Sequence, residues 1–103
     1  MTDVARLHRE LVARVLGGDA KAPREMRRAA FDGAGLDEPT RTLVDRVANR
    51  SYAVTDEDVA AARAAGFSED QIFELMVCAA VGAADRQYNS AMAALTEASG
   101  GGR

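Results

Sequence analysis

The sequence predicts a single all-α domain over residues 1–98, followed by a flexible tail over residues 99–103. Apolar residues recur at helical spacing, period-2 alternation is absent, and β-branched residues are sparse. Glycines and prolines divide the chain into about five helical segments. With 103 residues, the chain has room for only one hydrophobic core.

The first expected helix runs from Asp3 to Leu16, with Thr2 as its N-cap. We expect Gly17 and Gly18 to end this helix, because glycine adopts the left-handed conformation of a helix C-terminus without strain. One apolar stripe at helical spacing is formed by Val4, Leu7, Leu11 and Val15.

The second helix is expected to begin near Pro23 and end at Gly33, and the third to begin near Pro39 with Asp37 or Glu38 as its cap. The basic run of the second helix, residues 24–28, is interpreted as a solvated face. The inward-facing residues of the third helix are predicted to be Leu43, Val44, Val47 and Ala48.

The fifth helix is the most apolar segment and follows a fourth helix that ends at Gly66. It opens with Ser68 and Gln71, whose spacing is that of a capping box. Its residues 72–84 are apolar on nearly every side, so we expect one face to meet another subunit. The helix continues toward Ala98 unless Gly82 or residues 89–90 interrupt it.

Charge and cysteine content narrow the functional classes. The net charge is −3 with acidic and basic residues interspersed, which argues against a nucleic-acid partner. Cys78 is the single cysteine, so neither an intrachain disulfide nor a two-thiol cycle is available. We expect no secretory signal, no membrane-spanning segment and a cytoplasmic location.

Four adjacent acceptor-bearing side chains stand at residues 55–58, in the segment TDED. They favour a helix start, because Thr55 and Asp58 have capping-box spacing and carboxylates suit the positive end of a helix dipole. A metal site is disfavoured, because the spacing of a calcium loop and neighbouring His or Cys ligands are missing. The sequence predicts no metal and no cofactor.

Other residues with chemical potential have simpler interpretations. The single histidine, His8, is favoured as a surface or interface residue, although histidine can act as a general base. Cys78 is favoured as an inert core residue. Asp85 and Arg86 follow the apolar run and are favoured as an ion pair or surface residues, although Arg86 could bind a carboxylate.

Two segments carry a family resemblance. Residues 37–52, DEPTRTLVDRVANRSY, precede residues 60–95, where an Ala-rich helix, the turn Ala65-Gly66-Phe67-Ser68 and an apolar helix follow one another. This pattern resembles the alkylhydroperoxidase-D-like / carboxymuconolactone decarboxylase family. The resemblance implies an all-α fold that assembles into trimers or hexameric rings.

The family resemblance also implies either thiol peroxidase chemistry at a C-x-x-C-x-x-x-H motif or metal-free decarboxylation of a small lactone acid. Counting back from Gly66 places the motif's two cysteines at Ser51 and Val54 and its histidine at Asp58. None of these three residues matches the motif, so the thiol mechanism is not carried over.

Two functional hypotheses follow from the sequence. The first is a non-redox family member that binds a small molecule or a protein partner through a homo-oligomeric fold, a trimer or hexamer. The second is a metal-free decarboxylase, lyase or isomerase acting on a small organic acid. Its catalytic residues would be Ser51, Tyr52 and Asp58, with His8 or Arg86 holding the substrate carboxylate. A pocket at Tyr52 with Asp58 turned inward would favour the enzyme, whereas Asp58 bonded to the Thr55 N–H would favour the binding module.

Overall fold

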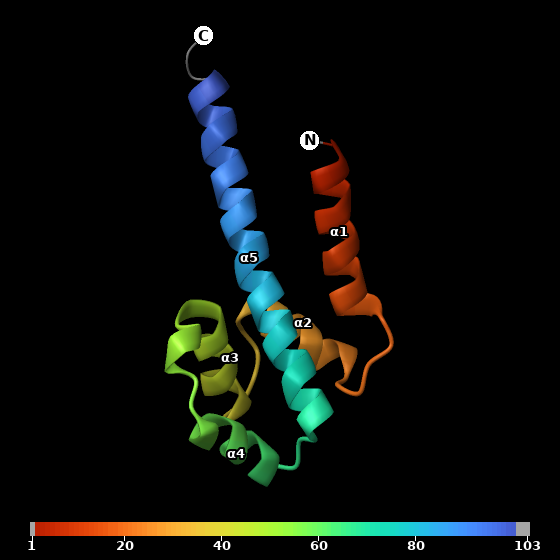
Figure 1. Ribbon diagram of the computed structural model, residues 1–103, viewed down its shortest axis with the longest axis vertical. Helices are drawn as coiled ribbons and strands as arrows, with labels where there is room; N and C mark the ends of the chain where they lie inside the picture. Colours follow the sequence, from red (N-terminus) through yellow and green to blue (C-terminus); the bar gives the residue numbers. More distant parts are fainter. Residues whose placement is uncertain (1, 101–103) are drawn as a thin grey trace.

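The long helix α5, Glu69–Gly100, organises the molecule. In the computed structural model, which describes residues 2–100 and the side chains of residues 3–99, every other helix packs against it. Helix α1 lies antiparallel beside the C-terminal half of α5, while the shorter helices surround its N-terminal half (Figure 1). The other elements in chain order are α1 (Thr2–Gly17), α2 (Arg24–Asp32), α3 (Thr40–Asn49), the 3₁₀ helix η1 (Ser51–Ala53) and α4 (Asp56–Ala64).

The all-α prediction is confirmed for the described residues, which contain five α-helices and no strand. Helix α5 is unbroken from Glu69 to Gly100, so residues 99 and 100, which the sequence assigned to a tail, are helical. The rest of the expected tail, residues 101–103, lies outside the described residues, as does the side chain of Thr2, the expected N-cap of α1.

The core forms where α2 and α3 pack on the N-terminal half of α5. Phe31 from α2, Val44 from α3 and Leu75 and Ala79 from α5 are buried together. A second cluster joins Leu43, Ala62 and Ile72 from α3, α4 and α5. The third helix therefore buries Leu43 and Val44, as the sequence predicts, while Val47 and Ala48 are half-buried.

Gly82 shows why glycine occurs inside the longest helix. A Cβ at this position would lie 2.0 Å from the carbonyl oxygen of Phe31, so only glycine lets the end of α2 lie this close to α5. Arg86, one turn later, donates a hydrogen bond from Nη1 to the same carbonyl at 2.6 Å. Gly82 is therefore a contact point between two helices, and the helix continues through it.

The end of α1 differs from the expectation. Neither Gly17 nor Gly18 has a positive φ, whereas the glycines that end α2 and α4, Gly33 and Gly66, do. Two arginines of α2 instead bond carbonyls at this end: Arg27 donates to Val15 and to Gly18, just after the helix, at 3.2 and 2.7 Å, and Arg24 donates to Gly17 at 3.1 Å. A buried guanidinium thus takes the role that a left-handed glycine would have had.

Arg27 also corrects the interpretation of residues 24–28 as a solvated face. Its side chain is buried, and its Nε donates to the Ala22 carbonyl at 3.1 Å. On the same loop, the backbone N–H groups of Lys21 and Ala22 donate to the Glu74 carboxylate of α5 at 3.0 and 2.6 Å. These contacts fix the α1–α2 connection against α5. In the basic run, Arg27 is therefore a buried structural residue, Met26 is half-buried against the core, and only Arg24, Glu25 and Arg28 are exposed.

Candidate functional site

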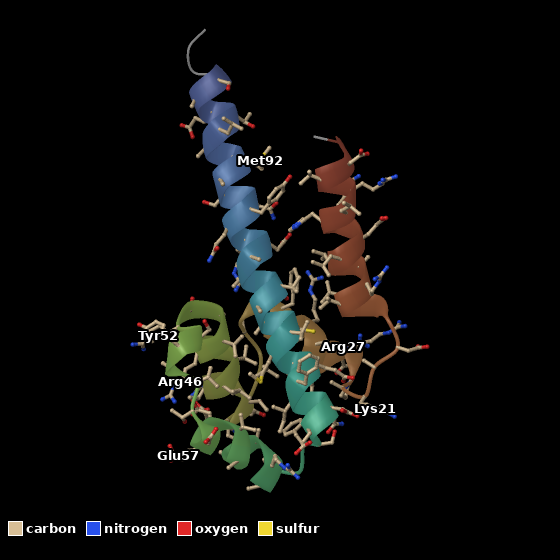
Figure 2. The ribbon with its side chains drawn as sticks, in the orientation of Figure 1. Lys21, Arg27, Arg46, Tyr52, Glu57 and Met92 are labelled. Carbon is tan, nitrogen blue, oxygen red and sulfur yellow. The ribbon has the colours of Figure 1, made fainter. Side chains whose placement is uncertain are left out.

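The proposed catalytic residues Ser51 and Tyr52 lie on η1, at the surface. Both are exposed, and 86% of the Tyr52 side chain is open to solvent. Figure 2 shows Tyr52 pointing away from the helical body. Neither residue lines any of the three main cavities formed by the described residues. None of these three cavities, which the described residues line, therefore offers a substrate an enclosed space at Tyr52.

Asp58 completes a capping box at the start of α4. Its Oδ2 accepts the Thr55 backbone N–H at 3.0 Å, while the Thr55 hydroxyl accepts the Asp58 N–H at 3.2 Å. Arg46 of α3 donates from Nη1 to both carboxylate oxygens, at 2.8 and 2.7 Å. The Asp58 side chain thus connects α3 to α4 and is only 12% exposed.

These hydrogen bonds change the acidity of Asp58. The Thr55 backbone N–H, and then the Arg46 guanidinium, hold the pKa of Asp58 below its ordinary value. A general base for work near neutral pH needs a raised pKa, so this shift favours a structural role. Of the two hypotheses, the contact between Asp58 and Thr55 favours the binding module.

His8 and Asp85 connect α1 to α5. His8 Nε2 lies 2.7 Å from Asp85 Oδ1, and each side chain is 21% exposed. The imidazole stacks on Tyr88 with ring centroids 4.5 Å apart, and Asn89 donates to the other Asp85 oxygen at 3.3 Å. The ion pair expected between Asp85 and Arg86 is therefore not found among the described residues, because the Asp85 carboxylate contacts His8, 77 residues earlier in the chain, and Arg86 is exposed.

A cavity of about 390 Å³ opens beside this pair. Residues of both helices line the cavity. Three of them, Arg9, Ala13 and Asn89, each directly follow a residue that faces the other helix, and all three are exposed. No buried side-chain polar atom lacks a hydrogen-bond partner among the described residues, and both carboxylate oxygens of Asp85 have a side-chain partner, His8 for one and Asn89 for the other. We therefore interpret the His8–Asp85 contact as a structural contact that holds α1 against α5.

The side of the α1–α5 pair that lies opposite this cavity is apolar and exposed. Val4, Leu7 and Leu11 are 55%, 60% and 47% exposed, and each directly precedes a residue that lines the α1–α5 cavity, namely Ala5, His8 and Val12. On α5, Ala84, Gln87 and Ala91 likewise precede Asp85, Tyr88 and Met92 and are exposed.

Moving back by one residue changes the direction of the side chain by about 100° about the axis of each helix. Because α1 and α5 are antiparallel (Figure 1), this turn carries both stripes to the same side of the pair. We call this surface the two-helix face; it consists of Val4, Leu7, Leu11, Ala84, Gln87 and Ala91. The sequence showed the α1 stripe, but only the packing against α5 shows that it points outward.

Arg86 lies away from His8 and from the two-helix face. It is exposed on α5 and lines the largest cavity, about 620 Å³, between the α2–α3 loop, α3 and α5. The structure thus separates the two residues proposed to hold a carboxylate. Sequence reasoning did not identify Asp45 and Asn49, which line the same cavity from α3, because neither belongs to a recognisable motif.

Cys78 is buried in the core beneath α1. Its sulfur lies 3.8 Å from the Val15 carbonyl oxygen, and burial raises the pKa of the thiol. A thiol with a raised pKa forms little thiolate, so Cys78 is a poor nucleophile.

Several findings concern the wider functional classes. Among residues 3–99, no three His, Cys, Asp or Glu side chains come together as metal ligands would. Within the described part of the chain, none of the helices combines the length and hydropathy needed to cross a membrane.

No family model, curated protein or solved structure matches the chain significantly.

Proposed function

We propose that this chain is a non-redox, non-catalytic helical module that works by self-association. We further propose that it is a degenerate relative of the alkylhydroperoxidase-D-like / carboxymuconolactone decarboxylase family. The single observation that carries the self-association is the two-helix face, where three large apolar side chains of α1 are each about half exposed.

The two-helix face is suited to a second copy of itself. Helix α1 contributes large side chains, Val4, Leu7 and Leu11, and α5 contributes small ones, Ala84 and Ala91. A two-fold axis parallel to the helices would place each α1 on the partner's α5, so that large residues meet small ones in both halves. The result would be a four-helix bundle, the common solution for burying two paired amphipathic helices.

Charge and shape support the same arrangement. Helix α1 carries Arg6, Arg9 and Arg14 against two acids, while residues 85–100 of α5 carry two acids against one arginine. The radius of gyration is 15.7 Å, compared with about 13 Å for a compact domain of this size. The excess comes from the α1–α5 projection, whose exposed side a second copy would cover.

A two-fold pair is compatible with the assembly that the family resemblance implies. Three such pairs make a hexamer, and the exposed Phe73, near the start of α5, would be available for contacts between pairs. The small-organic-acid enzyme remains the alternative. The Asp58 carboxylate that this alternative would use is already bonded to Thr55 and Arg46.

Leu7→Glu tests the proposed face. Burying the exposed half of Leu7 contributes roughly 1 kcal/mol in each copy. Since about 1.4 kcal/mol corresponds to a factor of ten in affinity, losing both leucines should weaken self-association at least tenfold. Sedimentation velocity over a concentration series measures the shift toward monomer.

Ala60→Glu is the matched control. It introduces the same carboxylate with the same change in charge, at an exposed position of α4 that lies outside the two-helix face. We expect Ala60→Glu to keep the wild-type association state. Equal association of Leu7→Glu and wild type would show that the face is not the interface.

A further inference from the structure

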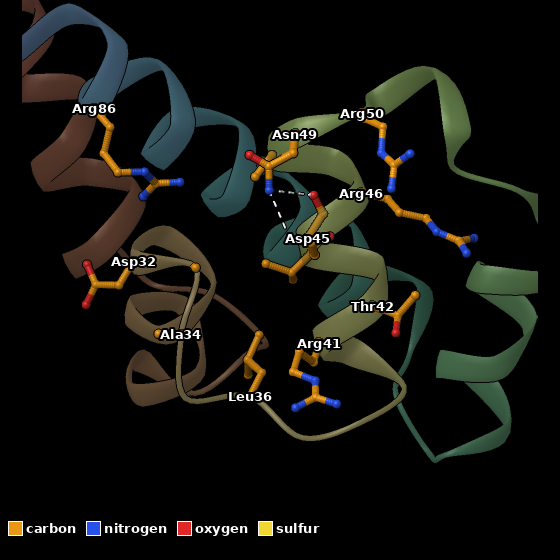
Figure 3. Close-up of a pocket in the computed structure, with 13 residues that line it drawn as sticks. Asp32, Ala34, Leu36, Arg41, Thr42, Asp45, Arg46, Asn49, Arg50 and Arg86 are labelled. Atoms are coloured by element: carbon orange, nitrogen blue, oxygen red, sulfur yellow. Dashed lines mark hydrogen bonds between the residues drawn. The ribbon is translucent and has the colours of Figure 1, made fainter. Parts of the chain in front are cut away.

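The cavity between α2, α3 and α5 has the size of a small-molecule site and a lining that is mostly polar. Its volume is about 620 Å³, and pockets for small ligands typically measure about 300–1,000 Å³. The apolar side chains that line it are the buried Leu36 and Val44, the half-buried Ala48 and the exposed Ala34. Polar side chains from α3 and α5 complete its lining (Figure 3).

Arg86 forms the cationic side of this cavity. Figure 3 shows its guanidinium pointing from α5 into the space in front of α3. Nη1 donates to the Phe31 carbonyl at 2.6 Å, and Nη2 lies beside Gly33, 3.7 Å from where a Cβ would be. No described carboxylate lies within ion-pair distance of Arg86, so one N–H is anchored and the others remain available.

Asp45 and Asn49 form the opposite wall. The Asn49 amide donates to the Asp45 carbonyl oxygen and to Asp45 Oδ1, at 3.2 and 2.9 Å. This contact leaves Asp45 Oδ2 as an acceptor. Among the described residues, Asp45 also has no ion-pair partner.

Arg86 and Asp45 therefore line one cavity without pairing with each other. Arg50, which follows the last residue of α3, also lines the cavity, is exposed, and has no ion-pair partner among the described residues. Asp32, Arg41 and Arg46 line the same cavity but already pair with Arg28, Glu38 and Asp58, respectively. The unpaired couple differs from these local ion pairs, because it comes from two helices and faces a cavity with apolar side chains. A ligand with charges in the opposite arrangement would complete it.

We propose that this cavity binds a small organic acid that carries a hydrogen-bond donor next to its carboxylate. The ligand carboxylate lies on the remaining N–H groups of Arg86, which suit bidentate contact with two oxygens. The adjacent hydroxyl or ammonium group donates to Asp45, and a short apolar portion lies against Leu36, Val44 and Ala48. The cavity shares no residue with the two-helix face, so this binding goes beyond self-association.

A matched three-carbon series tests this chemistry. Propionate, lactate and alanine have the same skeleton and carboxylate, but only lactate and alanine add a donor beside it. In ¹H–¹⁵N spectra of the full chain, we expect at least one of those two to shift the Asn49 side-chain amide and the Arg86 Nε–H saturably at millimolar concentration. Propionate should bind at least threefold more weakly. Equal affinity for all three would overturn the Asp45 contact, and the absence of saturable shifts with any of them would overturn the site.

Three variants locate the binding. Asp45→Asn keeps an acceptor for Asn49 but removes the charge, and Arg86→Gln removes the guanidinium; each should weaken binding at least tenfold. Arg86→Gln also removes the hydrogen bond to the Phe31 carbonyl and could change the packing of α2 on α5, whereas Asp45→Asn leaves that hydrogen bond in place. Arg63→Gln, which removes an exposed cation paired with Glu69, should leave the affinity unchanged. An equal loss in Arg63→Gln, or none in Asp45→Asn, would show general electrostatic attraction rather than a site.

Discussion

Asp58 shows how one residue decides between two functional hypotheses. The sequence allowed it to be a catalytic carboxylate or a helix cap, and its bonds to the Thr55 N–H and Arg46 give it the capping role. The cap was predictable from spacing alone, because a capping box involves residues three apart. The contact with Arg46 was not, because it depends on how α3 packs against α4.

Replacing Asp58 should change stability in a pH-dependent way. Its folded-state pKa lies below the unfolded value of about 3.9. The carboxylate therefore contributes stability that is present above that unfolded value and lost as the pH falls through the folded pKa. We expect Asp58→Asn to lower the Tm at pH 7, with the difference from wild type shrinking as the pH falls below about 3.9.

Asp56→Asn provides the control, because Asp56 is exposed in the same first turn and makes no side-chain hydrogen bond among the described residues. It should shift the Tm less than Asp58→Asn does at pH 7. A Tm difference for Asp58→Asn that stays constant from pH 7 to pH 2 would contradict the capping and ion-pair account.

Cys78 gives a chemical prediction at the same scale. Its thiol is buried with a raised pKa, and it is the single cysteine of the chain. We expect no peroxide reduction with a dithiol as electron donor, measured as consumption of hydroperoxide. Turnover that persists in Cys78→Ser would contradict the non-redox proposal.

Helix α5 illustrates what can and cannot be predicted for an element. Its start at the Ser68–Gln71 capping box is confirmed, with hydrogen bonds of 2.9 and 3.1 Å in the two directions. Its continuity through Gly82 stayed open, because glycine in a helical pattern fits either a break or a close contact. The Phe31 carbonyl, 51 residues earlier in the chain, decides between them, and such a contact leaves no local trace in the sequence.

Gly82→Ala tests the contact between α2 and α5. The added Cβ would lie 2.0 Å from a backbone carbonyl oxygen, so the helices must separate, and overpacking of this kind costs about 1–3 kcal/mol or more. Chemical denaturation should show this loss in the free energy of unfolding. Gly17→Ala is the control: nothing lies within 4 Å of its Cβ position and its φ is not positive, so it should be neutral or stabilising.

For the whole molecule, composition and periodicity were sufficient to predict the all-α class, because they report how each helix buries its own face. Which helix faces pack against each other could not be predicted from the sequence. The α1 stripe of Val4, Leu7 and Leu11 has the spacing of a core-facing stripe, yet His8 and Val12 face α5 instead. Likewise, Arg86 and Asp45 line one cavity only because α3 folds back beside α5.

The elongated shape and the two-helix face are parts of one claim: the molecule as described is one half of a larger bundle. The most direct test is the molar mass of the unmodified chain, measured by light scattering during gel filtration at micromolar concentration. The account predicts an even multiple of the 10.9 kDa chain mass, such as a dimer or a hexamer. A mass of 10.9 kDa that stays constant as the concentration rises would contradict it.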